Sequence, residues 1–124
     1  MEFYRCKHCG NIIAYVDHRG IDVVCCGEKM ERIEENTVEA STEKHLPVVK
    51  KDGNHVRVEV GSIAHPMEEK HYIQWIALET RNGNQRKILR PGDAPVAEFC
   101  ILEGDEVLKA YEYCNIHGLW STKL

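Results

Sequence analysis

Apolar and polar positions alternate with a period of two over most of the chain after Val38, which is the pattern of antiparallel strands. Helical periodicity is weak throughout the sequence. In the run 71–80, Ile73, Trp75 and Ala77 fall on one face and the residues between them fall on the other. Similar runs cover 45–50, 55–60, 85–89, 96–102 and 107–114. The pattern predicts about seven short strands in an immunoglobulin-like antiparallel β-sandwich.

Two turn sequences predict which of these strands form hairpins. Asp52-Gly53 separates the runs 45–50 and 55–60, and Asn82-Gly83 separates the runs 71–80 and 85–89. Both dipeptides readily adopt the positive φ angles that a tight hairpin requires. We therefore expect hairpins at 51–54 and 81–84.

The first 36 residues have a different pattern. They contain four of the six Cys and only short apolar runs such as 11–16. A piece below ~40 residues with so small a core usually needs a metal, disulfides or a partner chain to fold. The polar stretch 31–37 then leads into the alternating sequence. We therefore expect a mostly β protein with two domains, residues 1–36 and residues 37–124.

Charge and hydropathy exclude several classes of function. The 124 residues carry 16 Lys and Arg against 20 Asp and Glu, a formal charge of −4, so no strong global field attracts nucleic acid or an anionic membrane. No apolar stretch approaches the ~20 residues that span a bilayer, and the N-terminus lacks the basic-then-apolar order of a signal peptide. We expect a cytoplasmic protein with no nucleic-acid or membrane partner.

Four cysteines near the N-terminus form a first candidate metal site. Cys6-x-x-Cys9 and Cys25-Cys26 are each followed by a Gly, and four thiolates can close tetrahedrally on zinc or iron. The spacing does not decide between these two metals. Because neighbouring residues in an extended chain point apart, Cys25 and Cys26 predict a distorted tetrahedron. A disulfide scaffold would need an oxidising compartment, of which the sequence gives no sign.

A second set of donors is dispersed along the alternating region, at expected strand ends and loops. Loops of a β-sandwich cluster at its two ends, so ligands far apart in sequence can converge in space. Any single histidine is more often an ordinary residue, and the interpretation depends on the joint pattern. The donors are His45, His65, His71, Cys114 and His117.

With these motifs the whole chain resembles the desulfoferrodoxin family, which are two-iron superoxide reductases with a desulforedoxin-like N-terminal domain. The resemblance depends on the two Cys pairs, on Glu43-Lys44-His45, on His65 and His71, and on the segment 114–120, Cys-Asn-Ile-His-Gly-Leu-Trp. It implies an Fe(Cys)₄ centre at Cys6, Cys9, Cys25 and Cys26, where zinc is the alternative metal. It also implies a catalytic iron centre with an open sixth position, bound in plane by His45, His65, His71 and His117 and axially by Cys114.

The activity that the resemblance implies is one-electron reduction of superoxide to hydrogen peroxide, without oxygen as a product. Four neutral imidazoles and one thiolate leave the ferrous site with a net positive charge that attracts superoxide. Lys44 adds a local cation that steers the anion and organises a water for proton delivery. Glu43 is similar to the family carboxylate that takes the sixth position after oxidation. The resemblance also implies a small redox protein such as rubredoxin as the electron donor, and a homodimer.

Two other functions remain open from the residues themselves. A non-catalytic iron electron carrier would have a coordinatively closed second centre that ignores small anions. A zinc-binding structural or interaction module would show no visible absorption.

The remaining Cys, His and Trp residues are expected to be neither metal ligands nor catalytic residues. Cys100 lies in the middle of a run and is expected in the core, where a free Cys behaves as a small apolar group. The two Trp residues, Trp75 and Trp120, are expected to pack the sandwich, and Trp120 also to shield the 114–117 loop. Solvent-facing positions are expected for His8, His18 and His55.

Overall fold

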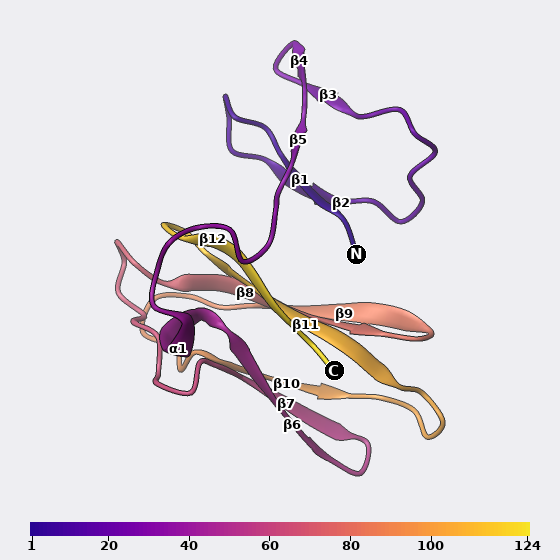
Figure 1. Cartoon of the computed structure of the whole chain (residues 1–124), viewed down its shortest axis with the longest axis vertical. Coiled ribbons are helices and arrows are strands. Elements are labelled where there is room, and N and C mark those ends of the chain that lie inside the picture. The colour runs from indigo at the N-terminus through magenta and orange to yellow at the C-terminus, as the bar shows by residue number, and fades with distance from the viewer. The chain divides into compact units, whose positions relative to one another are not determined.

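The computed structural model describes all residues, 1–124, and the chain divides into two compact units, Met1–Glu34 and Glu35–Leu124. Almost all regular structure is β-strand (Figure 1). The one helix, α1 (Thr42–His45), is a single turn. No helix is long and apolar enough to cross a bilayer.

The N-terminal unit contains a three-stranded antiparallel sheet and a separate two-stranded hairpin. The sheet has the order β2-β1-β5, and the hairpin pairs β3 with β4. The bounds are β1 (Phe3–Arg5), β2 (Ile12–Ala14), β3 (Val24–Cys25), β4 (Glu28–Lys29) and β5 (Glu31–Arg32). Its buried cluster consists of Tyr4, Cys6 and Met30, with Ile13, Tyr15 and Cys25 packed against it. Because two of these six residues are cysteines, the apolar core is as small as the sequence predicts.

His18 is held in the interior of this unit's long loop. Its ring stacks on Tyr15, with the centroids 4.1 Å apart, and its two nitrogens lie 2.9 Å from Glu2 and 3.0 Å from Asp22. The side chain is only 19% exposed, so the prediction that His18 faces solvent is wrong. The turn residues beside His18 suggest an exposed position, but its contacts with the carboxylates of Glu2 and Asp22 keep it mostly buried.

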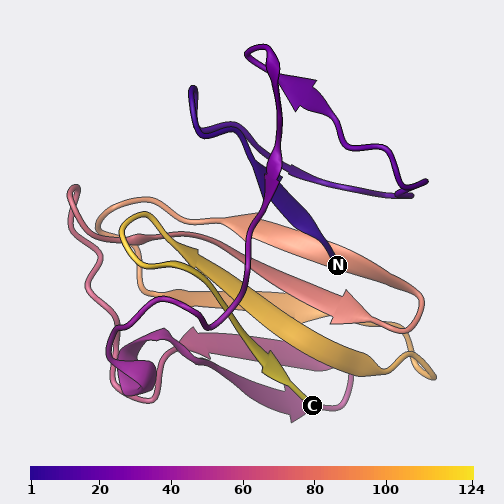
Figure 2. The same cartoon turned by 45° about the horizontal axis from the view of Figure 1, so that its top comes forward.

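The C-terminal unit is a sandwich of two antiparallel sheets, with strand orders β10-β7-β6 and β12-β11-β8-β9, which confirms the predicted fold class (Figures 1 and 2). The bounds are β6 (Pro47–Asp52), β7 (His55–Val60), β8 (Ile73–Thr80), β9 (Gly83–Ile88), β10 (Val96–Cys100), β11 (Val107–Cys114) and β12 (Gly118–Lys123). Alternate residues of β7, Val56, Val58 and Val60, are fully buried and pack with the inward residues of β8. This alternation is what period-two patterning produces when one face of each sheet is covered.

Both predicted hairpins are present. Asp52 pairs with His55 across the first turn, and Thr80 pairs with Gly83 across the second. Gly53 has a φ of 61°, the left-handed conformation that the first turn requires. The strand β12 falls in none of the predicted runs, because three consecutive residues, 119–121, are buried and no alternation marks it.

Two local predictions need correction. His45 was expected to begin a strand, whereas it ends the helical turn α1, and β6 begins at Pro47. Cys100 was expected in the core, whereas it is exposed. In β10 the inward positions are Ala97 and Phe99, so the period of two turns the next residue, Cys100, outward.

Candidate metal centres

The four sulfur atoms of the N-terminal unit converge on one point. The Sγ atoms of Cys6, Cys9, Cys25 and Cys26 all lie within 4.8 Å of one another. The first pair sits on a tight turn that follows β1, in which the N–H of Gly10 donates to the carbonyl of Cys6 at 2.9 Å. Within this turn the N–H of Cys9 donates to the Cys6 sulfur at 3.5 Å.

The adjacent cysteines are brought together by the β3–β4 hairpin. Cys25 pairs with Glu28, and the two residues between them, Cys26 and Gly27, have φ angles of 52° and 76°. Two consecutive positive φ angles are typical of a type I′ hairpin turn. The chain here is not extended, so the premise behind the predicted distorted geometry is wrong. The turn directs Cys26 toward the other sulfurs, and Cys9 Sγ lies 3.6 Å from Cys25 Sγ.

The electrostatics of these thiols fit a bound cation. Backbone N–H groups of Cys9 and His8 lower the pKa of Cys6 to about 6. The neighbouring sulfurs of Cys9, Cys6 and Cys25 raise the pKa of Cys26 to about 12. Four crowded thiols therefore cannot all ionise by themselves, and a metal ion is what would hold them as thiolates. His8 is 49% exposed and lies outside this group, as predicted.

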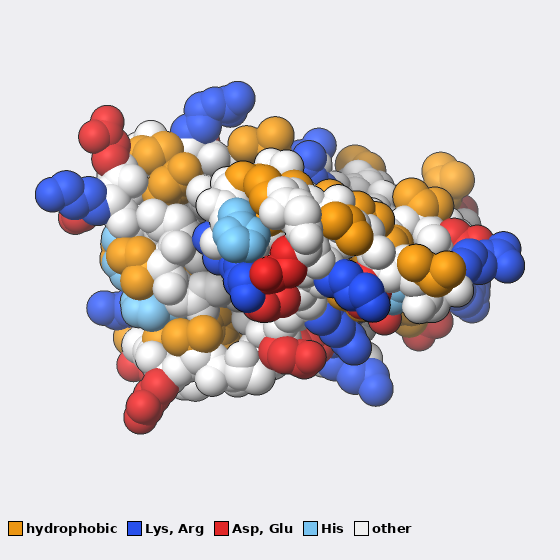
Figure 3. All heavy atoms as spheres, turned by 90° about the horizontal axis from the view of Figure 1, so that it is seen from above, with side chains coloured by type: hydrophobic (Ala, Val, Ile, Leu, Met, Phe, Trp, Pro, Cys, Tyr) orange, Lys and Arg blue, Asp and Glu red, His pale blue; other side chains and the backbone are white.

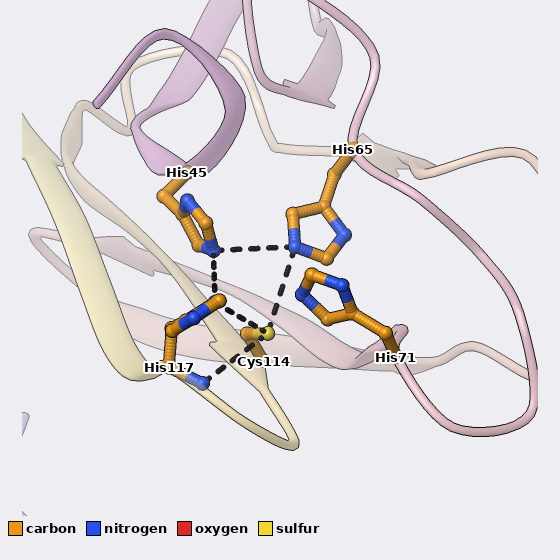
Figure 4. A group of neighbouring side chains, drawn as sticks. All are labelled: His45, His65, His71, Cys114 and His117. Atoms are coloured by element: carbon orange, nitrogen blue, oxygen red, sulfur yellow. Dashed lines mark hydrogen bonds between the residues drawn. The ribbon is translucent and has the colours of Figure 1, made fainter. Parts of the chain in front are cut away.

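The second donor group lies at one end of the sandwich and draws on three separate segments of the chain (Figure 4). His45 comes from α1, and His65 and His71 come from the connection between β7 and β8. Cys114 ends β11, and His117 lies in the turn before β12. One ligand atom from each of the five residues lies within 4.8 Å of every other.

Three imidazole nitrogens in this group face one another at short range. His45 Nε2 lies 3.2 Å from His65 Nε2 and 3.1 Å from His117 Nδ1. The sulfur of Cys114 lies 3.5 Å from His65 Nε2 and 3.9 Å from His117 Nδ1. In Figure 4 the rings and the sulfur point toward a common centre.

Backbone carbonyls set which nitrogen of each ring carries the proton. His45 Nδ1 lies 2.7 Å from the carbonyl of Ser41, and His65 Nδ1 lies 2.6 Å from the carbonyl of Pro66. A carbonyl only accepts, so in each ring Nδ1–H donates and Nε2 carries a lone pair that faces the centre. Two lone pairs 3.2 Å apart repel each other unless a cation lies between them. His71 Nε2 is also buried with no hydrogen-bond partner, which is a further orphaned donor for a metal.

Burial favours the neutral form of three of these histidines, His45, His65 and His71, and it opposes ionisation of the thiol. It lowers the pKa values of His45 and His71, and it lowers that of His65 to about 4. The same burial raises the pKa of Cys114, against backbone N–H groups that favour the thiolate. The N–H of His117 donates to the Cys114 sulfur at 3.4 Å. Neutral imidazoles and a thiol that requires a cation are a donor set that fits a transition metal such as iron.

Glu43 and Lys44 lie on the same helical turn as His45, and both are exposed. The charge of Lys44 contributes to the lowered pKa values of His45 and His71, so it acts on this end of the sandwich. The backbone N–H of Glu43 and the hydroxyl of Ser41 lower the pKa of the Glu43 carboxyl. No hydrogen bond or ion pair joins either side chain to the five donors.

Several groups around the second site are absent from the sequence predictions. The carbonyls of Ser41 and Pro66 belong to the backbone, so residue type does not reveal them. Glu112 of β11 is fully buried, and neither carboxyl oxygen has a hydrogen-bond partner. Burial raises the pKa of Glu112 to about 9. Its position two residues before Cys114 would have shown that it faces inward.

Trp120 covers the second site as predicted. It is 3% exposed, and its ring centroid lies 5.0 Å from that of His45. Its indole N–H donates to the carbonyl of His117 at 3.1 Å. The ring therefore supports one donor histidine and holds the peptide of another.

A β-sandwich with four imidazoles and a thiolate at one end, joined to a small four-cysteine unit, defines a two-centre non-haem metalloprotein. The model of the desulfoferrodoxin family matches residues 37–123, and that of the desulfoferrodoxin N-terminal domain matches residues 1–33. The chain belongs to the desulfoferrodoxin family. Its two donor groups match the two iron centres of that family.

Individual relatives cover nearly the whole chain. A desulfoferrodoxin of Nitratidesulfovibrio vulgaris is 52% identical over 122 residues, which are 98% of this chain and 95% of the relative. The crystal structure of the superoxide reductase from Treponema pallidum has a TM-score of 0.83 at 42% identity and covers 98% of both chains. A one-iron superoxide reductase from Giardia intestinalis matches 66% of this chain and 97% of its own, with a TM-score of 0.57 and 36% identity.

Proposed function

We propose that this chain is a superoxide reductase, which reduces superoxide by one electron to hydrogen peroxide and releases no oxygen. The observation that carries the proposal is the convergence of four imidazoles and one cysteine sulfur at one end of the sandwich. The relatives named superoxide reductase, including a Pyrococcus abyssi protein 35% identical over 99 residues, support the same activity.

The two centres have different roles. Residues 1–36 form the domain that holds iron on Cys6, Cys9, Cys25 and Cys26, and residues 37–124 form the reductase domain. In the reductase domain the iron ligands are His45, His65, His71, His117 and the sulfur of Cys114. Iron held by these five donors would supply one electron and a free coordination position to a small anion.

The residues around the second centre control charge and access. Burial favours the neutral form of His45, His65 and His71, and Cys114 provides the only negative ligand. A dication bound in this site would therefore keep a net positive charge, which would attract superoxide.

Lys44 and Glu43 are the catalytic side chains that do not bind the resting metal. The ammonium of Lys44 attracts the anion and orients a water that delivers a proton to the reduced substrate. Once the iron is oxidised, the carboxylate of Glu43 would serve as a further ligand. Their shared turn with His45 supports both roles, because it places them beside a ligand.

The proposed reaction requires an electron donor, and the N-terminal unit has a surface suited to a second copy of the chain. A small redox protein such as rubredoxin returns the electron that each turnover consumes, and the reaction takes place in the cytoplasm. The protein is a homodimer that buries part of the N-terminal unit. Val16, Ile21 and Val24 of that unit are 105%, 84% and 59% exposed, which supports such an interface. Apolar side chains also reach the surface seen in Figure 3.

Metal analysis with visible spectra, followed by pulse radiolysis of the reduced protein with superoxide, tests the proposal. We expect two irons per chain, a thiolate-to-ferric band and rapid oxidation that yields hydrogen peroxide. Iron that is inert to superoxide would indicate an electron carrier. Zinc alone, in protein shown not to have lost iron, would indicate a structural module.

The ligand assignment has a separate test. His65→Ala and His117→Ala should each lose iron from the second centre and lose superoxide consumption. Full superoxide consumption by either variant would refute that ligand. The Fe(Cys)₄ band should persist in both variants, and it serves as the control for folding.

A further inference from the structure

The backbone of the Glu43–Lys44 turn is held by a neighbouring loop, the segment 60–65 that leads from β7 to His65. The carbonyl oxygen of Glu43 accepts two hydrogen bonds from this loop. One comes from the N–H of Ile63 at 3.0 Å, and the other comes from the hydroxyl of Ser62 at 3.2 Å. This carbonyl belongs to the peptide group that joins Glu43 to Lys44, so its orientation fixes the directions in which both side chains leave the turn.

The same loop approaches the turn so closely at Gly61 that no side chain fits there. A Cβ on Gly61 would lie 2.6 Å from the carbonyl oxygen of Glu43, 3.0 Å from that of Leu46 and 3.1 Å from the carbonyl carbon of Lys44. All three atoms are backbone, so no rotamer change can relieve the clash. The φ angle of Gly61 is not in the left-handed region, so the requirement is for space rather than for conformation.

His65 ends this loop, and its N–H donates to the carbonyl of Val60 at 2.9 Å. The loop therefore holds a ligand histidine at one end and the turn with Glu43 and Lys44 along its length. His45 has an additional anchor, because its Nδ1 bonds to the carbonyl of Ser41. The two hydrogen bonds to the Glu43 carbonyl can therefore be weakened while the hydrogen bonds that anchor His45 and His65 remain.

We propose that Gly61 and Ser62 are positioning residues, which fix the placement of the Lys44 and Glu43 side chains beside the second centre. This inference rests on the proposed function of these two side chains. Catalytic geometry is sensitive to displacements of about 1 Å, which can cost ~100-fold in rate. The close packing at Gly61 and the two donors to Glu43 are the features of the chain that prevent such a displacement.

Four variants of the iron-loaded protein test the proposal: Ser62→Ala, Ser62→Thr, Gly61→Ala and Gly83→Ala. Ser62→Ala removes one donor from an exposed site, and Ser62→Thr retains the hydroxyl. Gly83→Ala is the matched control, because a Cβ there meets nothing within 4 Å. The measurements are hydrogen exchange of the segment 41–46, iron content and visible band, and the rate with superoxide as a function of ionic strength.

We expect Ser62→Ala to speed exchange of 41–46 several-fold and to slow the reaction by roughly twofold to tenfold, the range that one lost hydrogen bond allows. The rate of this variant should depend less on ionic strength, because Lys44 is displaced. Its iron content and the thiolate-to-ferric band of the second centre should stay unchanged. Ser62→Thr should have the wild-type hydrogen exchange, reaction rate and ionic-strength dependence. Gly61→Ala should have the larger effect, and Gly83→Ala should have none. If Gly61→Ala fails to fold, the serine pair decides the question.

Unchanged exchange and rate in Ser62→Ala would overturn the proposal. A slower reaction that occurs only with loss of iron would overturn it too, because the loop would then act through the metal ligands. Exchange is measured without superoxide, so it tests the loop independently of activity. A wild-type protein that does not react with superoxide would refute the proposed function instead.

Discussion

Replacing Trp120 by phenylalanine keeps an apolar ring against His45 but removes the indole N–H. That group donates to the carbonyl of His117 at 3.1 Å, and the side chain is only 3% exposed, so water does not readily replace the lost donor. Leaving a buried carbonyl without a partner costs about 1–3 kcal/mol. With about 1.4 kcal/mol for each factor of ten, the change corresponds to ~5- to 150-fold in an equilibrium constant.

This loss falls on the turn that carries Cys114 and His117, so we expect it to weaken metal binding at the second centre. Substitution of outer-shell groups typically costs 10–100-fold in metal affinity, which agrees with the range from the carbonyl. Iron-loaded wild-type and Trp120→Phe protein would be titrated with a chelator, and the iron retained at each centre would be followed through its visible band. The Fe(Cys)₄ centre provides an internal reference, because its four cysteines belong to the other unit of the chain and have no ligand in common with this centre.

Trp75→Phe is the control for ring truncation. Trp75 is also buried, and it stacks on Tyr113 with the centroids 5.5 Å apart. It should lower the free energy of unfolding without releasing iron at a lower chelator concentration. If Trp120→Phe retained second-centre iron as wild type and Trp75→Phe do, the assigned role of the indole hydrogen bond would be refuted.

Three further predictions concern the surface of the C-terminal unit. Lys44→Ala should slow the reaction with superoxide by roughly tenfold and weaken its ionic-strength dependence, whereas Lys44→Arg should keep that dependence; an unchanged rate in pulse radiolysis would remove Lys44 from the mechanism. Lys50 and Arg57 hold the pKa of the Glu59 carboxyl below its usual value, so this contribution to stability is complete above about pH 4.5 and is lost as the pH falls through the folded-state pKa. Urea unfolding should show Glu59→Gln less stable than wild type at pH 7 and equal to wild type once the pH is below the folded-state pKa of Glu59. A difference independent of pH would contradict the ion-pair explanation. Cys100→Ser should leave the free energy of unfolding within about 0.5 kcal/mol of wild type, and native Cys100 should react with a maleimide; protection from the reagent would show that the thiol is not exposed.

The sequence predicts most of the sandwich because its strands obey simple rules. The run 71–80 alternates clearly and becomes β8. In the other hairpin, between β6 and β7, Gly53 supplies the positive φ that the turn requires. The donors of the second site were all predicted, since four histidines and a cysteine in one joint pattern are distinctive. The outward direction of Cys100 was also available from the alternation of its strand, and the preference of free Cys for the core was the weaker guide.

Other features depend on contacts that the residue pattern does not encode. A single turn such as α1 is too short to show a helical period, so His45 was assigned to a strand. β12 lacks alternation because its neighbours cover successive residues on both faces. The left-handed conformation of Cys26 comes from pairing of β3 with β4, two strands of two residues each. Short pairings of this kind have too few positions to produce a periodic signal.

The inward nitrogens of His45 and His65 are fixed by main-chain carbonyls, at Ser41 and Pro66. A carbonyl is present whatever residue occupies the position, so no single amino-acid substitution can delete either acceptor. An insertion or deletion that shifts the chain by one residue would remove it, because the carbonyl would then lie elsewhere. The centre should therefore tolerate changes of residue type at positions 41 and 66 during evolution and be intolerant of changes in the length of these two segments.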